Sequence, residues 1–131
     1  MEIVNCDCND AIVSICKRIN WQNSRALLFL DPFATQVKWE TLEKIANTKA
    51  IDVWYLFPIN AVNRLLKKNG EIDETWKGVL DRMFGEKEWI NRLYIDNPQL
   101  NVFNTQELIK NVNFEELKNY IIERLETVFA K

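Results

Sequence analysis

The residues best suited to chemistry in this chain follow two short apolar runs. In sequence order they are Asp31, Pro32, Phe33, Pro58, Asn63 and Arg64. A carboxylate accepts hydrogen bonds or a proton, and an arginine suits a phosphate or a carboxylate. The chain has no histidine, which excludes a Ser–His or Cys–His nucleophilic pair within it. Any acid or base in the chain is therefore Asp, Glu, Lys, Tyr or Cys.

These side chains also have structural interpretations. Asp31 is suited to cap the segment that follows it, and Phe33 to pack on the next helix. Arg64 is suited to pair with a carboxylate such as Asp31 or Glu40, and Asn63 to bond to the backbone. The residues alone leave both interpretations open.

The three cysteines, Cys6, Cys8 and Cys16, do not suggest a disulfide framework, because their number is odd and two are almost adjacent. We expect reduced thiols. Structural zinc normally takes four Cys or His ligands, so Cys6 and Cys8 predict no metal site. Small residues packed at the end of a strand would explain them equally well.

The elements that must position these residues begin with strands at residues 26–30 and 51–57. Apart from Asp52 both runs are apolar without alternation, the pattern of strands covered on both faces of a parallel sheet. Residues 39–46 between them have helical apolar spacing, which predicts a right-handed βαβ unit. Ligands of such sheets bind outside the carboxyl ends of the strands, where Asp31 and Pro58 project.

Further elements are predicted on either side of this unit. Residues 2–6 suit a short strand, and residues 7–10 suit a helix start. Helices are expected at residues 60–69, 73–84 and 89–94, and from Asn104 and Asn113, the last with a capping box to Glu116. Residues 96–99 suit a turn, and residues 100–104 a strand or an extended loop. The three glycines all lie in the second half, so no predicted strand is followed by a glycine-rich cofactor turn.

The composition fits one globular domain. The chain has 131 residues, of which 47% are hydrophobic, including five Trp and seven Phe. Either an incomplete core or a partner surface would produce this aromatic load. The net charge of −2 does not support a general nucleic-acid or membrane surface, and the basic residues Arg64, Lys67 and Lys68 are typical of a solvated helix end. No apolar run approaches the roughly 20 residues of a membrane span and no signal peptide is evident, so we expect a cytoplasmic protein.

Several segments together resemble a known family. They are Phe29-Leu30-Asp31-Pro32-Phe33, Trp54-Tyr55-Leu56-Phe57-Pro58, Asn63-Arg64, Met83-Phe84-Gly85 with Trp89, and residues 120–125. In these the chain resembles the three-Cys-motif partner protein family of class I, S-adenosylmethionine-dependent methyltransferase-like proteins. The family name refers to cysteines of a partner and not to those of this chain.

The resemblance implies a role for each candidate residue. Asp7 and Asn9 would lie in the acidic turn near the adenine of S-adenosylmethionine. Asp31-Pro32-Phe33 would be catalytic, being similar to the Asp-Pro-Pro-Tyr signature of amino-methyltransferases, although the second proline is absent here. The remaining candidates, Pro58, Asn63 and Arg64, would bind substrate. The resemblance also implies truncation at both ends, without the first two strands, the glycine-rich loop or the last antiparallel pair.

Together these observations predict an α/β chain with a short, mostly parallel sheet flanked by helices, a partial Rossmann-like methyltransferase fold. Residues 1–69 would form a βα core and residues 70–131 a helical extension. One functional hypothesis is a methyltransferase fragment, inactive alone, whose parent acts on nucleic acid or another amine-bearing substrate. The other is a non-catalytic interaction or dimerisation module. In the strand order that the resemblance implies, the missing first strand would lie beside residues 26–30, so its absence would leave that edge uncovered. We therefore expect residues 2–6 to pair there, or a homodimer or partner protein to cover it.

Overall fold

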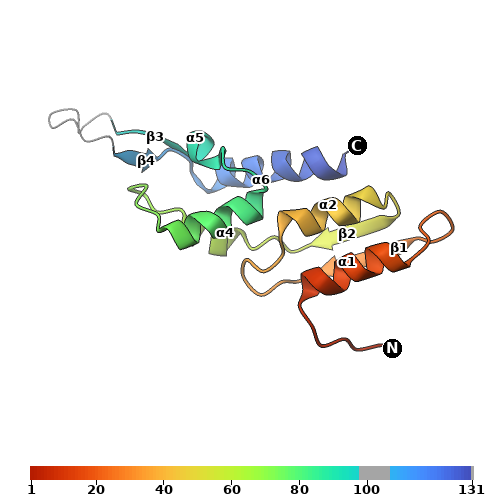
Figure 1. The fold of residues 1–131 in the computed structure, drawn as a ribbon. Helices are drawn as coiled ribbons and strands as arrows, with labels where there is room; N and C mark the ends of the chain where they lie inside the picture. Colours follow the sequence, from red (N-terminus) through yellow and green to blue (C-terminus); the bar gives the residue numbers. More distant parts are fainter. Residues whose placement is uncertain (98–106, 131) are drawn as a thin grey trace.

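The computed structural model describes residues 1–97 and 107–130 and is built around a parallel pair of strands (Figure 1). Strand β1 spans Ala26–Leu30 and strand β2 spans Ile51–Tyr55, and helix α2, Trp39–Asn47, connects them. The two strands pair in parallel register from Ala26 opposite Ile51 to Leu30 opposite Tyr55. This confirms the βαβ unit and the mixed α/β class.

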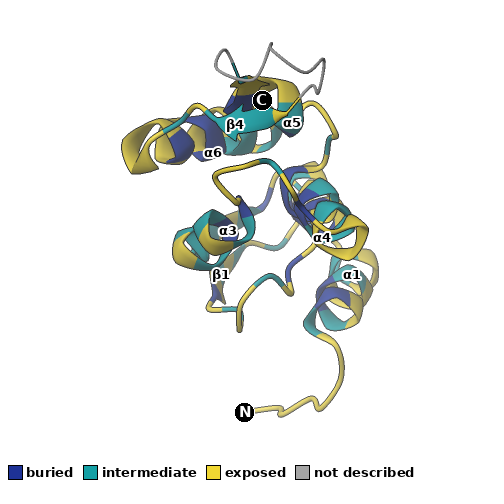
Figure 2. Cartoon of the chain, turned by 90° about the vertical axis from the view of Figure 1, so that its left-hand side faces the viewer, coloured by how far each residue is buried: buried dark blue, intermediate teal, exposed yellow. Residues whose placement is uncertain are grey.

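The described residues cover only one face of the sheet. Helices α1, Cys8–Arg18, and α2 pack together. The inward residues Leu28, Leu30, Val53 and Tyr55 belong to the same hydrophobic cluster as these helices. Burial alternates along β1 and β2, and every second side chain is exposed. Figure 2 shows how buried and exposed residues are distributed over the helices that pack beside them. The prediction of strands covered on both faces is therefore wrong, because an apolar run shows no alternation even where only one of its faces is packed.

The amino-terminal segment does not form the predicted strand. Residues 1–6 have no regular structure and are exposed, with Ile3 at 82% and Val4 at 61% of full exposure. The expected pairing of residues 2–6 with the edge of β1 is therefore also wrong. The helix signal is stronger than the strand signal here, because the Asp7 carboxylate accepts hydrogen bonds from the backbone N–H groups of Asn9 and Asp10.

A second, helical cluster occupies the rest of the chain. It contains helices α3 (Ile59–Leu65), α4 (Glu74–Phe84), α5 (Trp89–Leu93) and the first half of α6 (Phe114–Phe129). Its centre is aromatic. The rings of Phe84 and Tyr120 meet edge to face with their centroids 5.1 Å apart, and the centroids of Trp89 and Tyr94 are 6.4 Å apart. Since Val62 of α3 is fully buried in this cluster, its packing begins earlier in the chain than residue 70.

A short antiparallel pair closes this cluster. Strand β3, Tyr94–Asp96, pairs with β4, Leu108–Lys110. The predicted helix from Asn104 is therefore wrong over Leu108 and Ile109, because their backbone pairs with β3 and the Lys110 N–H donates to the Lys68 carbonyl at 2.8 Å. The turn predicted at residues 96–99 falls partly, and the segment 100–104 wholly, outside the described residues.

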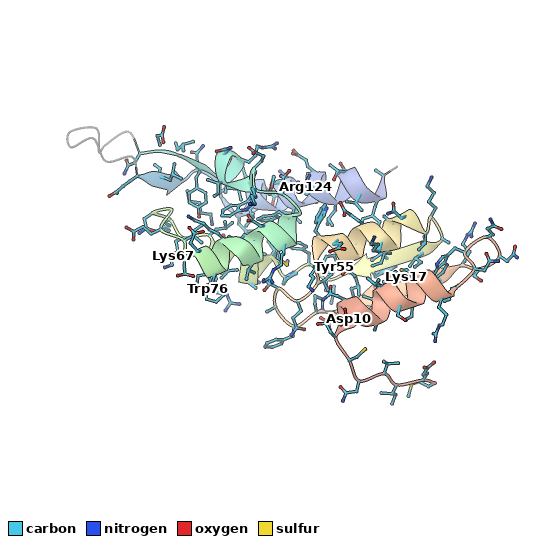
Figure 3. The ribbon with its side chains drawn as sticks, viewed as in Figure 1. Asp10, Lys17, Tyr55, Lys67, Trp76 and Arg124 are labelled. Carbon is cyan, nitrogen blue, oxygen red and sulfur yellow. The ribbon has the colours of Figure 1, made fainter. Side chains whose placement is uncertain are left out.

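Helix α6 joins the two clusters. It starts with the predicted capping box between Asn113 and Glu116, and its later residues Leu125 and Val128 pack on the βα unit. Arg124 lies where α6 passes α2 and α4 (Figure 3). Its guanidinium stacks over the Trp39 ring at 4.8 Å, and its Nη2 donates to the Phe84 carbonyl at 2.8 Å. We call this contact of Arg124 with Trp39 and Phe84 the joint between the clusters; it is held by a ring contact and a hydrogen bond.

Within the described residues, none of the helices combines the length and the apolar character that a membrane crossing requires.

Candidate functional site

The predicted site at the carboxyl end of the sheet is open to solvent. Asp31, Pro32 and Phe33 follow β1 directly, and Phe33 is 83% exposed. Asp31 is exposed and makes no hydrogen bond or ion pair to another described residue. Pro58 lies in the short segment between β2 and α3 and is the residue directly before α3. The two motifs therefore lie at the carboxyl ends of adjacent parallel strands, but none of the described residues orients the Asp31 carboxylate.

The predicted substrate residues of α3 are separated by their contacts. The Arg64 Nε donates to the Asn60 carbonyl at 3.2 Å, and its side chain is exposed. Asn63 instead accepts a hydrogen bond from Lys110 Nζ at 2.5 Å. Burial, and secondarily Lys68, lowers the pKa of Lys110. Among the described residues Arg64 forms no ion pair, so the predicted pairing with Asp31 or Glu40 does not occur.

Asn9 is a structural clamp in this arrangement. Its side chain is 4% exposed and lies between the start of α1 and the loop that leads into α2. Asn9 Nδ2 donates to the Gln36 carbonyl at 2.9 Å, while Oδ1 accepts from the Lys38 N–H at 3.0 Å and the Thr41 hydroxyl at 2.7 Å. Both lone-pair directions of Oδ1 are thus used within the fold.

Asp7 is likewise engaged in holding α1. Hydrogen bonding from Asn9, and then from the Asp10 backbone, lowers the pKa of Asp7. A carboxylate that caps a helix retains acceptor capacity, and Asp7 is exposed. Its role at a cofactor, as implied by the family resemblance, stays a prediction.

The residues present fit S-adenosylmethionine poorly. No glycine occurs before Gly70, so neither β1 nor β2 is followed by a turn that would let the backbone approach a nucleotide. A cavity of about 650 Å³ lies instead beside Lys49 and Ile51, at the amino end of β2. Its Arg124 is already held by the Phe84 carbonyl and the Glu86 carboxylate.

The most prominent exposed feature is the uncovered side of the two strands, which we call the sheet face. It consists of Leu27, Phe29, Asp52, Trp54 and Leu56. Its apolar side chains are largely exposed: Leu27 at 72%, Phe29 at 60%, Trp54 at 67% and Leu56 at 54% of full exposure. Phe29 lies opposite Trp54 and Leu27 opposite Asp52 in the register. This face was not among the predicted site residues, although the aromatic load and the single charge within the second strand were signals of it.

Comparisons with protein-family models, with curated proteins and with solved structures found no match to this chain. The candidate sites therefore rest on the geometry of the chain and on its chemistry. Within the described residues no cluster of three or more Cys, Asp or Glu side chains is arranged to hold a metal ion.

Proposed function

We propose that this chain is a protein-interaction module that binds its partner through the sheet face. The observation that carries the proposal is the exposure of four large apolar side chains on one side of a two-stranded sheet. An aromatic ring buries about 150–250 Å² when it is covered, so Phe29 and Trp54 alone provide a strong driving force for association. Clustered apolar exposure of this kind marks interaction surfaces, whereas single exposed apolar residues are ordinary.

The neighbourhood of the sheet face supports a protein as the partner. Aromatic rings on a sheet also suit stacking on nucleic-acid bases, but such platforms work together with a basic groove. This chain has a net charge of −2, and the sheet face itself carries a carboxylate, Asp52. Phosphates would be repelled there, while an apolar protein surface with a basic group would be accommodated.

Photo-crosslinking tests this proposal in cells that express the protein. A photoreactive phenylalanine at position 29 or 54 is expected to give adducts of discrete mass, because these positions contact the partner. The matched control is Trp76, which is 45% exposed but lies on α4 in the helical cluster. Absence of adducts from positions 29 and 54, or equal adducts from position 76, would contradict the proposal.

A second candidate is the methyltransferase-like fragment that the family resemblance implies. It is favoured by Asp31-Pro32-Phe33 and Pro58 following adjacent parallel strands. Calorimetric titration with S-adenosylmethionine separates the two candidates. Micromolar binding that is lost in Asp7→Ala would support the methyltransferase-like fragment, and absence of binding supports the interaction module.

A further inference from the structure

Two carboxylates lie at opposite corners of the sheet face. Asp52 is opposite Leu27 in the register, at the amino end of the strands. Asp31 follows β1 and continues its alternation, which places it at the carboxyl end beside Leu56. The ladder reaches this end, because the Leu56 N–H donates to the Leu30 carbonyl at 2.9 Å. Both aspartates are exposed, and within the described residues neither forms an ion pair, so their charges are available to a partner.

The apolar side chains of the sheet face form a stripe between these two carboxylates. Leu27 and Leu56 occupy the other two corners, and Phe29 and Trp54 lie side by side in the middle. At about 3.3 Å per residue the stripe is about 13 Å long, and its two ends lie on strands about 4.8 Å apart. The stripe therefore runs about 20° from the strand direction, with one carboxylate on each side of it.

We propose that the partner presents an amphipathic α-helix with a basic residue on each side of its apolar stripe, an inference that rests on the proposed interaction function. Two strands about 4.8 Å apart provide a face about 10 Å wide, which is the diameter of one helix. A stripe of about 13 Å corresponds to about nine residues of helix. Parallel strands are ordinarily covered by helices on both faces, and α1 and α2 cover only the other face here.

The charges favour a basic helix over a second copy of this chain. Two sheet faces in contact would gather four carboxylates around one apolar contact, Asp31 and Asp52 from each copy, and like charges across an interface weaken it. Arg25 precedes β1, but its Nη1 donates to the carbonyls of Trp21 and Ser24, and within the described residues it forms no ion pair. Lysine or arginine on a partner helix instead supplies a cation for each carboxylate.

A pair of designed peptides tests both the helix and its charge. Both are alanine-based and about 18 residues long, so that they are helical in water, with leucines at i, i+3, i+4, i+7 and i+8. One peptide carries a lysine on each side of the leucine stripe, and the other carries glutamates there. Fluorescence anisotropy of the labelled peptides measures both dissociation constants. The lysine peptide is expected to bind at least about tenfold more tightly at low salt, and the difference should shrink in about 1 M salt.

Variants of the chain show whether the peptide binds at the sheet face. The double variant Asp31→Lys and Asp52→Lys is expected to reverse the preference and bind the glutamate peptide more tightly. Trp54→Ala should weaken binding of the lysine peptide at least about tenfold. Trp76→Ala on α4 is the matched control and should leave this binding unchanged. Because all four positions are exposed, far-UV circular dichroism is expected to show that every variant folds.

The inference is overturned if neither peptide binds, if both bind equally, or if the folded double variant keeps the wild-type preference. Binding that survives Trp54→Ala would place the peptide elsewhere and overturn it too, as would a wild-type dimer that Trp54→Ala dissociates in sedimentation equilibrium. Crosslinking in cells distinguishes this failure from failure of the interaction function. Adducts from position 29 without peptide binding would refute the helix and retain the interaction module, whereas the absence of both would refute both.

Discussion

The two hydrophobic clusters of this chain differ in how completely they are enclosed. In the helical cluster Trp89, Leu80 and Leu117 are fully buried, and aromatic rings contact one another across α4, α5 and α6. In the βα unit Leu42 and Ile45 of α2 are fully buried, but the inward strand residues are mostly only partly buried. Trp54 and Phe29 on the opposite side of the strands are exposed. The helical cluster is therefore complete in one copy of the chain, and the βα unit is complete on one face only.

This difference separates two uses of the same residue types. Trp89 stabilises the fold, since its ring is enclosed and its Nε1 donates to Asp81 Oδ1 at 2.8 Å. Trp54 has no comparable enclosure, so its apolar area is available for a partner. Composition counts both residues alike, and only the packing of their neighbours distinguishes core from surface.

The largest expected effect comes from truncating the two tryptophans in parallel. Trp89→Ala should lower the free energy of unfolding by about 3–5 kcal/mol, because it opens a cavity in an enclosed core. Trp54→Ala should change it by no more than about 0.5 kcal/mol in the dilute chain. Denaturant titration of both variants measures this, with Trp89→Phe as the milder substitute if Trp89→Ala does not fold. Equal losses would contradict the difference between the clusters.

Substitutions in the interior of the βα unit should also lower the free energy of unfolding, and Asn9 tests this. Asn9→Ala leaves the Thr41 hydroxyl and the Lys38 N–H without their acceptor and should cost about 1–3 kcal/mol. Asn20, which is exposed and whose side-chain Oδ1 accepts from the nearby Gln22 N–H, is the matched control and should cost less when replaced by alanine. Thermal unfolding compares the two. A neutral Asn9→Ala would show that the clamp does not hold the unit together.

The joint between the clusters should depend on a glycine. Gly85 ends α4 at φ 69°, and a Cβ there would collide with the Trp39 indole. Gly85→Ala should therefore destabilise the chain by more than about 1 kcal/mol. Gly78→Ala is the control, since nothing lies within 4 Å of its added Cβ, and in the interior of α4 it should stabilise by about 0.5–1 kcal/mol. Effects of the same sign in denaturant titration would contradict this account of the joint.

How far the sequence predicts this structure depends on the range of the interactions that decide each element. The parallel strands, the capping box of Asn113 and the end of α4 at Gly85 follow from local patterns, and all are present. The strand expected at residues 2–6 is absent, and Leu108 lies in a strand where a helix was expected. In both cases the outcome depends on whether a distant segment pairs with the backbone, which local propensity does not report.

The candidate sites illustrate the same limit. The placement of Asp31 and Pro58 at the carboxyl ends of adjacent strands was predictable, because parallel strands end at one edge. The use of Asn9 as a clamp was not, since its partners Gln36, Lys38 and Thr41 come together only when α1 packs on α2. The exposure of the sheet face could not be predicted from the sequence either, because an apolar strand has the same sequence pattern whether one of its faces or both are covered.

The smallest effect concerns the helix caps, which should behave alike in both regions. Hydrogen bonds from Thr75, first from its backbone N–H, lower the pKa of Asp73 from its ordinary value of 3.8, as capping does for Asp7. Because the folded state holds these carboxylates ionised, their stabilisation is present above about pH 4 and is lost as the pH falls through the lowered pKa. Asp7→Ala and Asp73→Ala should each be slightly less stable than the wild type at neutral pH.

Thermal unfolding from neutral to acidic pH measures this pH dependence. The difference between each variant and the wild type should narrow below pH 3.8, where the aspartates become protonated in the unfolded chain. A difference that stays constant with pH would show that the caps do not act through their charge.

Hydroxyl-radical footprinting of the dilute chain tests the contrast between the clusters most directly. The internal standards are Trp76, which is 45% exposed, and Trp89, which is fully buried. At concentrations where the chain sediments as a monomer, Trp54 and Phe29 should be oxidised at least as readily as Trp76, while Trp89 should be protected. Protection of Trp54 equal to that of Trp89 in the monomer would show that the chain covers its own sheet face, and would contradict the account.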